Sequence, residues 1–160
     1  MPHVTIEYAI LLPVLFTQVI VFPFVASMIT SNWQESQRDA ALQEVADHLA
    51  STVQQLYLTV NREEILAGTI THALSLPPTV GSYPYTAVGS LSSPSDPNST
   101  RILTLTLTME EGDTVTAAAV MGPNVIWTEG SILQSNSADV SINIQKLSDS
   151  NSTIIFSFGG

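Results

Sequence analysis

The sequence contains no cysteine and very few basic residues. Of its 160 residues, four are Lys or Arg and fourteen are Asp or Glu, which gives a formal net charge of −10. The absence of cysteine excludes disulfide frameworks, cysteine-based zinc sites, iron–sulfur centres and thiol nucleophiles. Because the chain is acidic and has no basic cluster, we expect no nucleic-acid partner and no binding to an anionic membrane surface.

Recognisable catalytic and metal-binding motifs are also missing. The three histidines, His3, His48 and His72, lie in different segments and do not have the spacing of metal ligands. The sequence has no HExxH, no Gly-rich phosphate loop and no GxSxG. We therefore predict no catalytic residue, no metal and no cofactor other than covalent N-glycans, and we expect that the protein is not an enzyme. A membrane-tethered enzyme is the weakest of the hypotheses kept open.

The most prominent feature present is a long apolar run near the N-terminus. Residues 8–29 read YAILLPVLFTQVIVFPFVASMI and carry no charge. As a helix this run would span roughly 33 Å, enough to cross the hydrocarbon core of a bilayer. Trp33 follows at the position where interfacial aromatic residues are common. We predict a membrane-compatible helix.

This run does not resemble a complete secretory signal, because no Lys or Arg precedes Arg38. Two explanations stay open. A basic leader was removed upstream of the helix, or Met1 is the true initiator.

The helix is expected to continue beyond the apolar run. Residues 32–66 contain no Gly or Pro and are rich in good helix formers. Apolar residues recur there at steps of three or four, which predicts one buried stripe: Leu42, Val45, Leu49, Val53, Leu56 and Val60. We predict one helix of about 60 residues that ends near Gly68. Pro13 and Pro23 either allow bending or extension during assembly or are tolerated kinks.

The remainder of the chain has the alternating pattern of β-strands. The predicted strands are 69–76, 102–109, 114–121, 125–128, 140–147 and 153–158, and residues 81–99 are expected to form turns and a loop. The fold class is therefore α+β, a long N-terminal helix followed by an antiparallel, immunoglobulin-like β-sandwich. We divide the chain into a helix at 1–67, apolar over about 6–30 and amphipathic over about 31–67, and a head domain at 68–160.

Two tripeptides fit the N-glycosylation motif, Asn98-Ser99-Thr100 and Asn151-Ser152-Thr153. Both lie in segments expected to be exposed turns, as glycan acceptors must be.

Glu7 is unusual because it is an acid at the head of the apolar run. Burying it without a partner would cost several kcal/mol. It either pairs with a positive charge of another subunit, such as a free N-terminal amine, or stays at the aqueous interface.

Together these features resemble a type IV pilin. The segment VTIEYAILLPVL is similar to the start of TadE-like pilins, and the sequons, the β-rich head and the lack of cysteine resemble the archaeal pilin and archaellin branch. The resemblance covers residues 3–66 by pattern and the head only by class. In the family the glutamate is the fifth residue of the mature chain, a position that Glu7 would hold if maturation left His3 first.

The resemblance implies a structural subunit of an extracellular, cell-surface helical filament. Copies of the chain would be its main partners, with the membrane holding the helix before assembly and a pilus motor and platform driving extraction. The residues expected in the assembly contact are Glu7, Tyr8, Leu11, Leu12, Pro13, Leu15, Phe16, Val19, Ile20, Pro23 and Phe24. The alternative is a single-span, membrane-anchored minor pilin or surface binding module.

Overall fold

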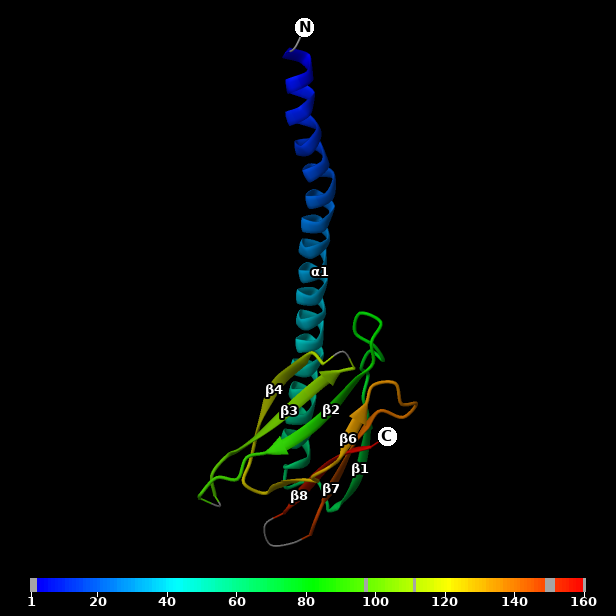
Figure 1. Ribbon diagram of the computed structural model, residues 1–160. Coiled ribbons are helices and arrows are strands. Elements are labelled where there is room, and N and C mark those ends of the chain that lie inside the picture. The colour runs from blue at the N-terminus through cyan, green and yellow to red at the C-terminus, as the bar shows by residue number, and fades with distance from the viewer. Residues whose placement is uncertain (1–2, 97, 111, 149–151, 160) are drawn as a thin grey trace. The chain divides into compact units, whose positions relative to one another are not determined.

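The computed structural model describes residues 3–96, 98–110, 112–148 and 152–159, with side chains described from residue 11 onward (Figure 1). Within these residues the chain forms one long helix, α1 (His3–Val60), followed by eight strands. It separates into two compact units, Met1–Gln37 and Arg38–Gly160, which are described here one at a time. We call the second unit the head.

The strands of the head form two four-stranded sheets. Their bounds are β1 (Gly68–Ala73), β2 (Tyr85–Leu91), β3 (Arg101–Met109), β4 (Thr114–Met121), β5 (Val125–Trp127), β6 (Ile132–Gln134), β7 (Ser141–Lys146) and β8 (Ile154–Gly159). One sheet has the order β1-β7-β8-β5 and the other the order β4-β3-β2-β6. The predicted α+β class is confirmed. Among the described strands, all ladders but one are antiparallel. Strand β5 pairs with β8 in parallel, which the sequence pattern did not predict. The immunoglobulin-like description of the head stays a prediction.

Strand β3 shows how the alternating sequence forms the head. Leu103, Leu105 and Leu107 are fully buried, while the threonines between them are on the opposite face and half-buried. Leu105 lies between Ala117 of β4 and Gly89 of β2 in the two ladders. Because side chains alternate across a strand, this single register places every second apolar residue of β3 on the core side.

The last part of α1 belongs to the head and completes its core. In Figure 1 these turns of the helix lie behind β2, β3 and β4. The predicted stripe is confirmed: Leu42, Val45, Leu49, Val53 and Val60 are buried, Leu56 is partly buried, and Ala46, Ala50 and Tyr57 join them. The compact head thus begins at Arg38, whereas the sequence-based division placed the start of the head domain at Gly68.

The helix ends at Val60, earlier than the predicted end near Gly68. Lys146 of β7 is buried, and its Nζ donates hydrogen bonds of 2.8 Å to the backbone carbonyls of Val60 and Arg62. A cation that satisfies terminal carbonyls stabilises a helix end, both by hydrogen bonding and through the helix dipole. The partner lies 84 residues or more away in the sequence, so local propensity alone could not reveal this end.

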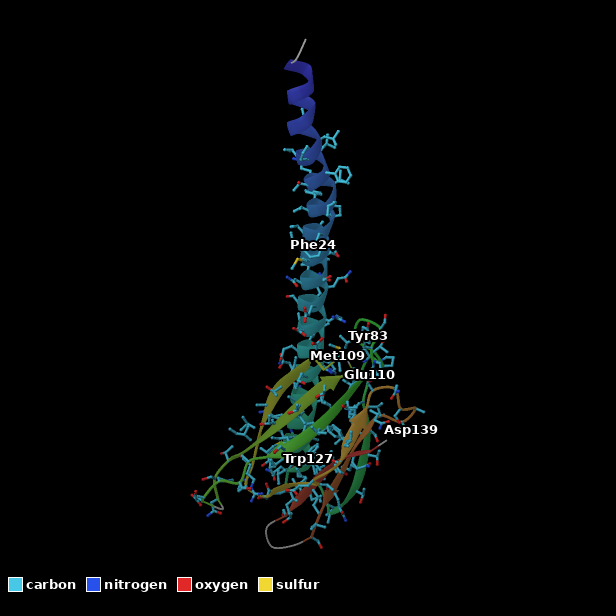
Figure 2. The ribbon with its side chains drawn as sticks, viewed as in Figure 1. Phe24, Tyr83, Met109, Glu110, Trp127 and Asp139 are labelled. Carbon is cyan, nitrogen blue, oxygen red and sulfur yellow. The ribbon has the colours of Figure 1, made fainter. Side chains whose placement is uncertain are left out.

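Two strands were not predicted, β2 and β6. Strand β2 falls within residues 81–99, which we expected to be turns and loop because they are rich in Ser, Pro and Gly. Its Gly89 is needed for packing: a Cβ there would lie 2.4 Å from the ring of Trp127 (labelled in Figure 2). Trp127 in turn makes an edge-to-face contact with Phe158, with ring centroids 4.9 Å apart. A glycine within the segment expected to be turns and loop therefore makes room for the indole ring.

Candidate assembly surface

The unit Met1–Gln37 exposes an apolar surface on every side of its helix. All side chains from Leu11 to Gln37 are exposed, and Phe22 reaches 77%. Figure 2 shows these side chains around α1, with Phe24 labelled. The large apolar members are Leu11, Leu12, Val14, Leu15, Phe16, Val19, Ile20, Val21, Phe22, Phe24, Val25, Met28, Ile29 and Trp33. By length and composition this helix could cross a membrane.

Apart from Pro13, and from Glu7 and Tyr8, whose side chains lie outside the described residues, the predicted assembly residues form two neighbouring rows along the helix. One row is Leu11, Leu15, Val19 and Pro23, and the other is Leu12, Phe16, Ile20 and Phe24. Between them lies a wholly apolar hollow lined by Leu11, Leu12, Leu15, Phe16 and Val19. Rows of side chains four residues apart are the ridges that fit into the grooves of a neighbouring helix. The residues predicted for assembly include these rows but not the apolar residues on the other sides of the helix, such as Val14 and Phe22. The apolar composition of the whole segment could have indicated that these residues are also available for contacts.

Three hydroxyls of this unit are hydrogen-bonded within the helix. The helix continues through Pro13 and Pro23. The hydroxyls of Thr17, Thr30 and Ser31 each donate to the carbonyl four residues earlier, at 2.8, 2.9 and 3.0 Å. Hydroxyls bonded in this way can enter an apolar environment without leaving a donor unpaired.

Three of the predicted positions lie outside the residues or side chains that the structure describes. Glu7 and Tyr8 belong to α1, but their side chains lie outside the described residues, so the proposed pairing of Glu7 stays a prediction. Asn151 also lies outside the described residues. Asn98 is described: it is exposed, in the connection between β2 and β3.

Among the described residues, no group of three His, Asp or Glu side chains is arranged to hold a metal ion. His48 and His72 are both exposed, one on α1 and the other on β1. The head does carry a surface hollow of about 380 Å³ next to Asn98, which sequence reasoning missed. One feature of the sequence could have indicated this hollow: Arg101, one of only four basic residues, directly follows the first sequon.

Two tyrosine hydroxyls make hydrogen bonds that join separate segments of the head. Tyr85 is buried, and its hydroxyl donates to the Pro77 carbonyl at 2.8 Å. Burial raises the pKa of Tyr85 to about 12. The Tyr57 hydroxyl of α1 donates to Oδ1 of Asn124 at 3.3 Å, and burial raises the pKa of Tyr57 as well. Both residues thus stay neutral at ordinary pH and hold segments of the head together through hydrogen bonds.

Arg38, the first residue of the head, makes a contact that stabilises the fold. The Arg38 guanidinium carbon lies 5.5 Å from the centre of the Tyr83 ring. Gly81, with a positive φ of 57°, lies beside the Arg38 side chain, where a Cβ would come within 2.9 Å of it. This cation–π contact joins α1 to the turn before β2.

Comparisons with protein-family models, with curated proteins and with solved structures give no match to this chain.

Proposed function

We propose that this protein is a structural subunit of an extracellular, type IV pilus-like helical filament. In this proposal the N-terminal helices of many copies pack together in the filament core, and the heads form its outer coat. The observation that carries the proposal is the surface of residues 11–29, which is apolar on all sides and exposed along its whole length.

Covering so apolar a surface lowers the free energy, and the core of the head does not use it. The head already has a closed core of its own, formed by both sheets and the last part of α1. At roughly 1.5 kcal/mol for each large side chain, covering the exposed set named above would gain on the order of 20 kcal/mol relative to water. Lipid and neighbouring helices both provide an apolar environment. The segment is therefore suited to lie in the membrane first and among neighbouring helices after assembly.

Two features favour neighbouring copies as the final environment. The paired rows on either side of the Leu11–Val19 hollow provide ridges and a groove for helix packing. A helix that is apolar all round can contact several neighbours at once, and repeated contacts between unlike faces produce helical filaments rather than closed dimers. Extraction from lipid gains little energy by itself, so the proposal includes an assembly motor and platform.

The head suits the outer coat. It places threonines on the outer faces of its strands, as in the Thr108 and Thr114 pair of β3 and β4, whose hydroxyls are 3.4 Å apart. Asn98 is exposed and available for an N-glycan. The proposal assigns the head no enzymatic role.

Filaments sheared from the source cells test the proposal. The account predicts that this chain is their most abundant protein, by mass spectrometry of the purified filaments. If the chain remains in the membrane fraction, and sheared filaments contain it only in traces, it is instead a membrane-anchored minor pilin or surface binding module.

A further inference from the structure

The connection between β2 and β3 holds Asn98 in a defined position at the edge of a hollow. The backbone amide of Asn98 donates to Oδ1 of Asp96 at 3.0 Å, and the Ser99 amide donates to the Asp96 carbonyl at 3.1 Å. The Asn98 side chain is exposed, and its side-chain amide makes no hydrogen bond to any described residue. It is therefore accessible to a glycosyltransferase while its backbone is held in a turn.

The hollow of about 380 Å³ beside Asn98 has the mixed lining that a sugar requires. Its walls include Asn98, Arg101, Pro123, Asn124, Ile126 and Thr153. Ile126 is 47% exposed and Pro123 is exposed, so both offer apolar surface to the C–H face of a sugar ring. Arg101 and Asn124 are half-buried. The guanidinium of Arg101 offers N–H donors to the sugar hydroxyls, whereas the Asn124 amide is bonded within the head. Apolar walls with a few placed polar groups are the usual composition of a small-ligand site.

The polar groups of this hollow are held in place by the fold. Arg101 Nη1 donates to the Val125 carbonyl at 2.9 Å, which fixes the guanidinium against β5. The Asn124 amide nitrogen donates to Oδ1 of Asn61 at 2.9 Å and to the Ser152 carbonyl at 3.0 Å. Groups that are already ordered lose little entropy when a ligand binds.

We propose that this hollow seats the first sugars of an N-linked glycan attached to Asn98. Attachment at the rim makes the contact intramolecular, so weak contacts with Ile126, Pro123 and Arg101 suffice to hold the sugar. The seated glycan covers Ile126 and β5, an outer strand of its sheet, and so stabilises the head. This inference rests on the cell-surface location in the proposed function.

The test uses the full chain, produced in a host that performs N-glycosylation and purified in mild detergent. Occupancy of Asn98 is measured by mass spectrometry, and thermal unfolding is compared with Asn98→Gln and Thr100→Ala, which remove the same sequon in different ways. We expect the glycosylated wild type to unfold roughly 3–5 °C above both variants.

The variant Ile126→Ser tests the hollow itself. It should remove most of the glycan-dependent difference in unfolding temperature and change the glycan-free chain little. The matched control is Ile132→Ser, since Ile132 in β6 is 51% exposed but does not line the hollow, and it should leave the difference intact.

Two results would overturn the inference. One is an unmodified Asn98 in a host that glycosylates a control protein carrying the same tripeptide. The other is a glycan that raises the unfolding temperature equally with Ile126 and with Ser at that position. Neither result depends on whether filaments form, which is scored separately in the sheared fraction.

Discussion

The Nζ atom of Lys146 lies 2.8 Å from the carbonyl oxygen of Val60, the last residue of α1. The lysine is in β7, so this hydrogen bond joins the C-terminal end of the helix to one of the two sheets. Lys146 is one of only four basic residues in the chain and is 7% exposed.

Replacing Lys146 with Met is expected to destabilise the head by about 3 kcal/mol. The substitution keeps an apolar side chain of similar length but leaves the Val60 and Arg62 carbonyls without their charged donor. Removing one partner of a buried hydrogen bond is destabilising because the other partner stays buried and unsatisfied. Thermal unfolding of the full chain in mild detergent measures the effect. The control is Arg62→Met, because the Arg62 side chain is exposed while its carbonyl is retained. Equal unfolding temperatures for both variants would refute the role of Lys146.

Replacing Gly89 with Ala is expected to disturb the packing of Trp127. The new Cβ would lie within 2.4 Å of the indole ring, so the ring must move away from its contact with Phe158. Overpacking of this kind costs about 1–3 kcal/mol. Near-ultraviolet circular dichroism and thermal unfolding report the change. Gly68→Ala is the matched control, because a Cβ at that strand position meets nothing within 4 Å; if it destabilises the head as much, packing against Trp127 is not the cause.

The stability of the head should fall at alkaline pH, partly through Tyr85. Its pKa is about 12 in the folded state because of burial, compared with 10.0 as the reference value. Below pH 10 the phenol is protonated in both states and its contribution is complete. As the pH rises from 10 to about 12 the unfolded state loses the proton first, so this contribution is lost.

The Tyr85→Phe variant isolates this effect. It removes the titrating group and the hydrogen bond to Pro77, so it should be less stable than wild type below pH 10 and should lose less stability above it. Tyr57, whose pKa is also raised, is present in both proteins and cancels in the comparison. Parallel pH profiles of unfolding temperature for the two proteins would contradict the assignment.

The sequence predicted the elements whose patterns are local. The uninterrupted apolar run and the 42–60 stripe predicted one long helix, and the alternation over residues 102–109 predicted β3 because every second side chain there is apolar. Features that depend on distant partners were missed. The helix end depends on Lys146, and the parallel β5–β8 pairing depends on tertiary contacts. Strand β2 was missed because its segment is rich in Ser, Pro and Gly, although its Gly89 serves to make room for Trp127. The hollow beside Asn98 combines residues from two strands and three connections, so the sequence pattern could not predict it.

A charge placed in the apolar segment should block assembly. In Leu15→Lys the new ammonium group enters an apolar environment at a cost of about 3 kcal/mol per copy, repeated along the filament. The control is Leu58→Lys, since Leu58 is on the same helix and is 58% exposed, compared with 53% for Leu15, but belongs to the head. Sheared filaments, quantified by electron microscopy, should disappear in the first variant and persist in the second. Normal filaments from the Leu15→Lys variant would argue against a role for this segment in the core.

The central claim is that residues 11–29 pack against the same segment of neighbouring copies in the assembled filament. Electron cryomicroscopy of filaments sheared from the source cells tests it most directly. The account predicts a map in which Leu15, Phe16 and Val19 lie at the filament axis, packed against the helices of neighbouring copies, with the heads outside. A map that places these residues away from any shared helical core, or a protein that is recovered only as a detergent-bound monomer, would contradict it.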